Sequence, residues 1–79
     1  MESKKENSGI SLNLSDEEAL VLLNWVFRFN DGENDSFFED QAEERVLWDI
    51  EAVLEKVTAE IFDGNYTELL AKARDKVRD

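Results

Sequence analysis

The sequence predicts an all-α fold: a three-helix up-down bundle with a long central helix and a short extended N-terminal arm. Residues 15–30 join a helix-start signal to an apolar run, residues 36–62 hold no proline or glycine, and residues 65–78 carry one apolar face. In the second and third stretches, apolar residues recur at intervals of three and four, which is typical of one face of a helix. We therefore expect a single helical domain over residues 10–79 and a disordered tail over residues 1–9.

The N-terminal arm is the first part of the predicted domain. Residues 1–9 are polar and lack periodicity, whereas Ile10, Leu12 and Leu14 alternate with polar residues. Alternation with a period of two indicates a short strand or an extended arm. Because one strand cannot form a sheet alone, we expect the arm to lie along the helices or to pair with its copy in another subunit.

The first predicted helix covers residues 15–30. Ser15 is a favourable N-cap residue, and Glu18 three positions later completes a capping box. Nine of the eleven residues from 19 to 29 are apolar, and they cover most of the helix circumference. A helix that is apolar nearly all round has to be buried on more than one side.

The second predicted helix covers residues 36–62 and follows a polar loop that contains Gly32. Ser36 and Glu39 repeat the capping-box signal at its start. Five apolar residues at intervals of three and four form the predicted packing face against the first helix: Leu47, Ile50, Leu54, Val57 and Ile61. Val46 and Val53 broaden this face into a core-facing stripe. Glu43 precedes this face by one turn, so it either reaches water at the helix end or forms a buried ion pair.

The third predicted helix covers residues 65–78. Gly64 closes the second helix, and Asn65 with Glu68 supplies another N-terminal cap. One face is apolar, and the basic residues gather toward the C-terminal end, where they complement the helix dipole.

The size and composition of the chain limit how it is stabilised and where it acts. A chain of 79 residues is near the lower limit for a self-sufficient core. With no cysteine and no histidine, disulfides and zinc sites are excluded, and oligomerisation remains as a means of stabilisation. The sequence shows no secretion signal and no apolar run long enough to cross a bilayer. We expect a soluble cytoplasmic protein.

The residue types argue against an enzyme. Histidine and cysteine, the commonest general base and the thiol nucleophile, are both absent. Four carboxylates cluster near the start of the second helix (Glu39, Asp40, Glu43 and Glu44), and we interpret them as a solvated face. The loop over residues 30–35 fails the EF-hand pattern around Gly32. We therefore predict no cofactor, no metal and no catalytic residue; a carboxylate-based, metal-dependent hydrolase is the least favoured alternative.

Several large side chains lie away from the predicted core face. Trp48 lies roughly 160° from the centre of that face, beside the small residues Ala52 and Ala59. The arm or the third helix could cover this side, or a partner could, because exposed apolar patches mark interfaces. Trp25 and Phe29 raise the same question on the first helix. We predict a homodimer with contact residues Trp25, Phe29, Phe37 and Trp48 and an acidic rim of Glu44, Glu51 and Glu55.

The charge distribution narrows the class of partner. The net charge is −11, and residues 31–60 alone carry eleven acidic residues against Arg45 and Lys56. Such a chain is repelled by phosphate backbones and by anionic lipids, so direct binding to nucleic acid or to a membrane is not expected. Besides a homodimeric protein-binding or regulatory module, the alternative is an acidic inhibitor of a basic nucleic-acid-binding protein, of the immunity or nucleic-acid-mimic type.

Two resemblances accompany this interpretation. The runs LSDEEALVLLNW (residues 14–25) and FEDQAEERVLWDIEA (residues 38–52) resemble a family of small acidic helical bacterial proteins of unknown function. That resemblance implies a bacterial cytoplasmic protein and assigns no site residue. In size, acidity and helix content the chain is also similar to colicin immunity proteins. Their adjacent pair of exposed tyrosines has no counterpart here, because Tyr66 is the only tyrosine.

Overall fold

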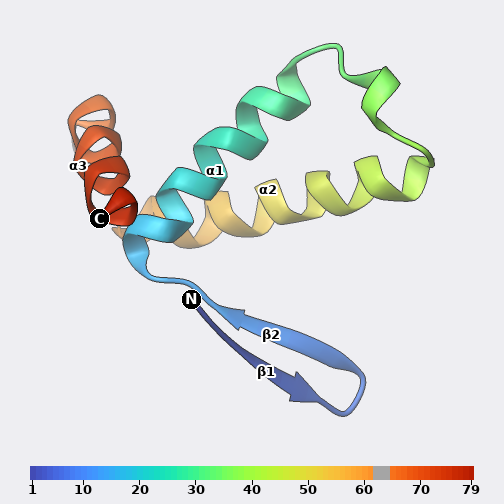
Figure 1. The fold of residues 1–79 in the computed structure, drawn as a ribbon, viewed down its shortest axis with the longest axis horizontal. Helices are drawn as coiled ribbons and strands as arrows, with labels where there is room; N and C mark the ends of the chain where they lie inside the picture. The colour runs from blue at the N-terminus through green and yellow to red at the C-terminus, as the bar shows by residue number, and fades with distance from the viewer. Residues whose placement is uncertain (62–64) are drawn as a thin grey trace.

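The computed structural model of the protein describes residues 1–61 and 65–79, apart from the side chains of residues 35 and 59–61 (Figure 1). Strands β1 (Glu2–Glu6) and β2 (Gly9–Asn13) come first, followed by helix α1 (Asp16–Asp31) and a 3-10 helix at Asp35–Phe37. Helices α2 (Gln41–Ile61) and α3 (Tyr66–Arg78) complete the chain. The predicted end of the second helix, with Phe62 and Gly64, lies outside the described residues.

The predicted all-α fold class is wrong, because β1 and β2 form an antiparallel hairpin. Lys5 pairs with Ile10 and Ser3 pairs with Leu12, across a two-residue turn at Asn7 and Ser8. The predicted arm is therefore the second strand of a hairpin. The first strand has the sequence ESKKE, in which no apolar residue marks an inward face. Only the short turn could have indicated it, since two-residue connections typically join hairpin strands.

The capping box predicted at the start of α1 is confirmed. The Ser15 hydroxyl accepts a hydrogen bond from the Glu18 backbone N–H at 3.1 Å, and the Glu18 carboxylate accepts one from the Ser15 N–H at 2.9 Å. At the other end, the Asn34 side-chain amide donates to the Phe29 carbonyl oxygen at 2.6 Å. Both ends of α1 are thus closed by nearby side chains, which satisfy backbone groups that a helix leaves unpaired.

Helix α2 begins at Gln41 and not at the predicted Ser36, which lies in the 3-10 helix. The Asp40 carboxylate accepts a hydrogen bond from the Ala42 N–H at 2.7 Å, and Glu43 accepts one from the Glu39 N–H at 3.1 Å. The chain holds two capping signals four residues apart, and the structure uses the second. Glu43 is exposed and bonded to a backbone donor, so it forms no buried ion pair.

Helix α2 is rotated relative to its predicted packing face. Leu54 and Thr58 are buried, whereas Val57 is 49% exposed and Val53 is 61% exposed. The Thr58 hydroxyl donates to the Leu54 carbonyl at 2.7 Å, which satisfies this polar group inside the core. The buried line of α2 therefore contains a threonine that a pattern of apolar residues alone does not include.

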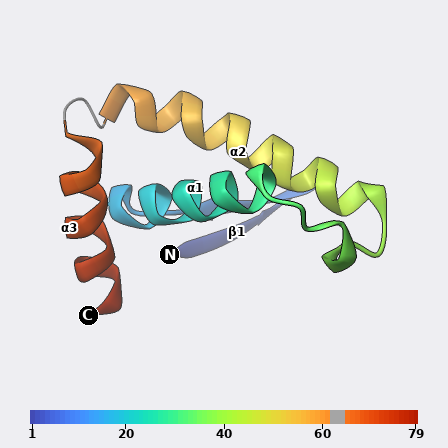
Figure 2. The ribbon, with the colours of Figure 1, turned by 90° about the horizontal axis from the view of Figure 1, so that it is seen from above.

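Helix α1, and not the longer α2, is the centre of the fold. It packs against both other helices, with no packing of α2 on α3 within the described part. Leu20 of α1 forms a core cluster with Leu70 and Ala73 of α3. Figure 2 shows that α3 crosses α1 steeply, so the predicted up-down arrangement holds for α1 and α2 only.

Polar contacts at the edge of the α1–α3 core hold the two helices together. The Lys76 ammonium lies 3.0 Å from the Glu17 carboxylate. Asn24 accepts a hydrogen bond from the Arg74 guanidinium at 3.1 Å and donates one to the Tyr66 hydroxyl at 3.2 Å. These contacts are exposed, so they orient α3 more than they stabilise it.

The cap at α2 gives a first prediction. We expect Asp40→Ala to lower the free energy of unfolding by about 0.5–2 kcal/mol, because an N-terminal acceptor of α2 is lost. Ser36→Ala, four residues earlier and outside α2, should change it by no more than about 0.5 kcal/mol. Urea unfolding of both variants tests this. A larger loss for Ser36→Ala would mean that the helix starts at the earlier signal.

The contact between Glu17 and Lys76 gives a second prediction. The hydrogen bond from Lys76 lowers the pKa of Glu17, so Lys76→Gln should raise that pKa toward its ordinary value. A carboxyl whose pKa is lowered by folding stabilises the protein above its unfolded-state pKa. That contribution is lost as the pH falls through the folded-state pKa.

Carboxylate titration by NMR measures this pKa directly. Lys72→Gln is the matched control, because it removes an ion pair with Glu68 at 3.2 Å within α3. The control should leave the pKa of Glu17 unchanged. An unchanged pKa in Lys76→Gln as well would contradict the pairing.

Candidate interaction surfaces

The protein exposes more surface than a monomer of its mass normally does. Its accessible surface is 6431 Å², whereas about 4,900 Å² is typical of a 9.2 kDa monomer. The radius of gyration is 13.9 Å, against about 12 Å for a compact chain of this length. Among the described residues, six apolar side chains are buried and twelve large ones are exposed. Much of the apolar surface that normally closes a core is therefore uncovered.

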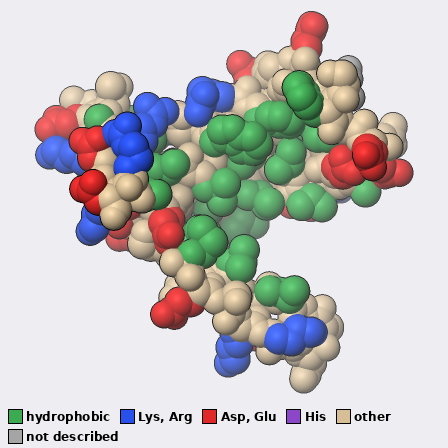
Figure 3. Space-filling model, viewed as in Figure 1, with side chains coloured by type: hydrophobic (Ala, Val, Ile, Leu, Met, Phe, Trp, Pro, Cys, Tyr) green, Lys and Arg blue, Asp and Glu red, His purple; other side chains and the backbone are tan. Residues whose placement is uncertain are grey.

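Part of this surface forms a groove between the hairpin and the helices. We call it the hairpin groove. It encloses about 440 Å³. Its lining residues are Ile10, Leu12, Leu14, Leu22, Val46, Asp49, Ile50, Val53 and Leu54. In Figure 3 hydrophobic side chains spread over α1, α2 and the side of the hairpin that faces them. The groove is thus a continuous apolar surface with one charged residue in its lining.

The hairpin beside the groove has little support from the helices, although the Met1 ammonium that precedes β1 lies 3.3 Å from the Glu18 carboxylate of α1. All ten of its strand residues are exposed, and neither strand packs against a described helix. Figure 1 shows it projecting from the helical body. An isolated two-stranded hairpin is at best marginally stable in water, and each of its outer edges has unpaired backbone groups. Both the groove and the hairpin therefore present surface that another chain can cover.

A second candidate surface gathers three of the four predicted aromatic contact residues. The rings of Trp25 and Phe29 stack with centroids 5.0 Å apart. Phe37 lies 6.3 Å from Phe29, and Phe38 meets Phe29 edge-on at 5.7 Å. Phe37 remains 71% exposed. Phe38, which adjoins the predicted Phe37, was not among the predicted contact residues.

Trp48, the fourth predicted aromatic residue, is 50% exposed and lines two small wells. The first well encloses about 200 Å³ and is lined by Phe29, Asn30, Gly32, Asn34, Phe38, Glu44 and Trp48. The second encloses about 210 Å³ and is lined by Phe27, Asn30, Asp31, Trp48 and Glu51. We call these the Trp48 wells. Of the small residues beside Trp48, Ala52 is exposed, and the side chain of Ala59 lies outside the description.

The three predicted rim carboxylates divide between these wells and the solvent. Glu44 lines the first well and is half-buried. Glu51 lines the second and accepts a hydrogen bond from the Asn30 side-chain amide at 2.9 Å. Glu55 is exposed on the same side of α2. Glu44 and Glu51 thus each line one of the wells, whereas Glu55 lines neither, and the role of all three as an interface rim stays a prediction.

Asn30 connects the two helices beneath Trp48. Its amide nitrogen also lies 3.4 Å from the Leu47 carbonyl oxygen. Its side-chain oxygen is buried and accepts no hydrogen bond from the described residues. Asn30 was not predictable as a link between helices, because an asparagine next to Asp31 and Gly32 resembles an ordinary loop residue.

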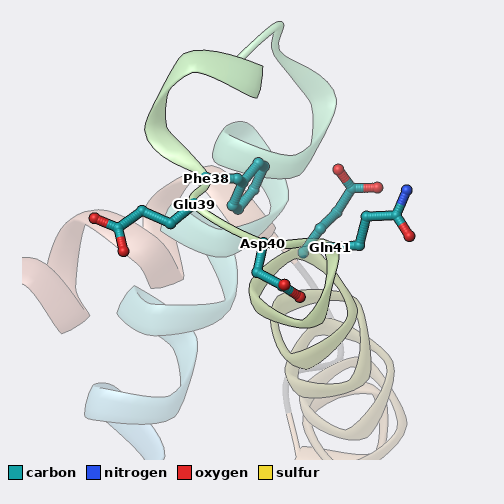
Figure 4. A pocket seen from close by; sticks show the side chains of 5 residues that line it. Phe38, Glu39, Asp40 and Gln41 are labelled. Carbon is teal, nitrogen blue, oxygen red and sulfur yellow. The ribbon is translucent and has the colours of Figure 1, made fainter.

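The carboxylate cluster at the start of α2 does not converge on one point. Figure 4 shows the Glu39 side chain pointing away from Asp40 and Gln41 around a shallow pocket. Asp40 and Glu43 are engaged in capping α2. Within residues 1–61 and 65–79, no three His, Cys, Asp or Glu side chains are grouped so as to hold a metal ion. The cluster is explained by the helix start.

Comparisons with family models, with curated proteins and with solved structures all give no match to this chain. The function is therefore argued from the surfaces alone. Among the described helices, none has the length and apolar character needed to span a bilayer.

The hydrogen bonds of Asn30 give a third prediction. We expect Asn30→Ala to lower the free energy of unfolding by about 1–2 kcal/mol, because the variant loses hydrogen bonds that join α1 to α2 in a partly buried position. Asn24→Ala on the same helix is the matched control. Its hydrogen bonds are exposed, so water replaces them and its loss should be smaller. Equal losses in urea unfolding would show that Asn30 has no special role.

Proposed function

We propose that the protein is a non-enzymatic protein-interaction module that acts as a homodimer, in which a second copy covers the hairpin groove. The groove is the observation that carries the proposal. It joins Ile10 and Leu12 of the hairpin, 72% and 60% exposed, to Val53 of α2 at 61%. Burying such side chains is favourable at roughly 25 cal/mol per Å² of apolar surface.

The surplus surface of one chain is more than one subunit of a typical stable dimer buries. The accessible surface exceeds the monomer expectation by roughly 1,500 Å². Stable protein–protein interfaces bury about 1,600 Å² in total, or about 800 Å² on each partner. Covering the groove and the inner face of the hairpin would therefore use part of the surplus and bring each subunit closer to a compact chain.

The charge pattern favours a second copy over an unrelated partner in this groove. The chain carries −11 overall, so self-association has to keep acidic surfaces apart. Asp49 is the one charged residue in the groove lining, and Arg45 lies 4.0 Å from its carboxylate. In Figure 3 acidic side chains gather near the start of α2 and basic ones over α3. The groove thus brings only one carboxylate of each chain into the contact, with Arg45 beside it, and homodimer interfaces are the more apolar class.

The proposed binding of another protein follows from the surface that the dimer leaves uncovered. The groove is formed by Val46, Ile50 and Val53 of α2, whereas Trp48 lies on another side of the helix. A dimer through the groove leaves the aromatic surface open to another protein. The sequence offers neither histidine nor cysteine for catalysis, which is why binding is proposed in place of a reaction.

The fourth prediction tests the dimer. Light scattering on a sizing column should give 18.4 kDa, twice the 9.2 kDa of one chain, over a range of concentrations. Val53→Lys should give a monomer, because it places a charge in the groove at a position that is exposed in the single chain. Ala71→Lys adds the same charge at an exposed position of α3 and should stay dimeric. A wild-type monomer at every concentration, or a dimer unaffected by Val53→Lys, would overturn the proposal.

A further inference from the structure

The Trp48 wells lie on the side of α2 away from the hairpin groove. At about 100° per residue, the direction of Glu44, Trp48 and Glu51 is roughly 150° from that of Val46, Ile50 and Val53. Leu54 and Thr58, between these directions, face the core. Helix α2 thus presents separate surfaces on two sides, and an occupant of the wells does not compete with a dimer through the groove.

The walls of both wells combine aromatic rings with carboxylates. The first well has Phe29, Phe38 and Trp48 beside Glu44. The second has Phe27 and Trp48 beside Asp31 and Glu51. The face of an aromatic ring is electronegative and attracts cations, and the attraction is strongest for tryptophan. A carboxylate in the same wall adds a charge-assisted hydrogen bond for an N–H donor.

Two further groups add negative potential beside the wells. Asn30 lines both wells, and its buried side-chain oxygen has no donor among the described residues. Helix α1 ends here at Asp31, so the negative end of its dipole lies at the wells. Neither well has a lysine or an arginine in its lining. The negative potential is therefore not balanced within the wells.

We propose that the two Trp48 wells bind cationic side chains, lysine or arginine, from a basic segment of a partner protein. Such side chains have an apolar stem that covers aromatic surface and a charged head that reaches the carboxylates. Because the wells share Trp48 and Asn30 in their linings, they accept two cationic residues next to the same indole ring. Nucleic acids and anionic membranes lack this chemistry and are repelled by the surrounding acidic residues.

The test uses the full-length protein and a blocked peptide of alternating glycine and lysine. Binding of the peptide is followed through the Trp48 indole N–H resonance of the protein, in NMR spectra recorded at low salt. We expect saturable binding that shifts this resonance. The same peptide with norleucine in place of lysine keeps the apolar stems and removes the charges, so it should not bind. Equal binding of the norleucine peptide, or no binding of the lysine peptide, would overturn the proposal.

Variants separate the wells from general attraction between opposite charges. The double variant Glu44→Gln, Glu51→Gln removes two charges but keeps acceptor oxygens, so the Asn30 hydrogen bond is retained. It should weaken peptide binding about fivefold to tenfold. Its matched control, Glu2→Gln with Glu68→Gln, removes the same charge from the hairpin and α3 and should bind nearly as the wild type does. If both double variants weakened peptide binding equally, the binding would depend on the net charge of the protein and not on the wells. That result would overturn the proposal.

Two more variants protect the test against indirect effects. Trp48→Leu keeps an apolar side chain at a half-exposed position, and the variant should lose peptide binding. Calorimetry measures the binding, and circular dichroism checks that the variant is folded. Val53→Lys should retain peptide binding whether or not the protein is a dimer, because it lies on the other side of α2. Undiminished binding by folded Trp48→Leu would rule out the wells as the site.

Discussion

The fold depends on the burial of α1, which is apolar around most of its circumference. Helix α3 covers Leu20 and Val21, and α2 packs along the same helix from another side. That leaves Leu22 at the floor of the hairpin groove and Trp25 at the aromatic surface. A chain of this length has only two other helices to offer, so the remaining sides of α1 form the two candidate interaction surfaces.

Helix α2 takes part in both surfaces because its side chains point in three different directions. Leu54 and Thr58 face the core, Val46, Ile50 and Val53 line the groove, and Trp48 faces the wells. A threonine on the core line is possible because its hydroxyl bonds to the backbone of its own helix. This frees apolar residues for the groove. The arrangement leaves the single chain with a small core, which is a reason to expect that stability and self-association are linked.

Local signals in the sequence predicted local structure, and they failed where a choice depended on the rest of the molecule. The Ser15 capping box is a four-residue interaction and was predictable. Two possible helix starts, at Ser36 and at Asp40, precede α2. The sequence does not show which of them the helix uses. The strand Glu2–Glu6 carries no apolar pattern, so the hairpin was missed. The predicted apolar face of α2 exists, but Val57 and Val53 on it face the solvent. Periodicity shows which residues share one face of a helix, but it does not show which other element packs against that face. Consequently Trp48 and the rim residues Glu44 and Glu51 were predictable as an outer surface, whereas the groove was not.

The hairpin groove and the Trp48 wells lie on opposite sides of α2, so both can be occupied at the same time. A dimer through the hairpin groove would hold two pairs of Trp48 wells in one rigid particle. A partner with two basic segments could then engage both, and the second contact would form at the high effective concentration set by the first. Each exposed ion pair contributes little alone, since solvent screens it. Self-association through an apolar surface is therefore what would convert weak recognition of cationic side chains into useful affinity, and Asp49, with Arg45 beside it, would be the one carboxylate of the groove lining in the dimer contact.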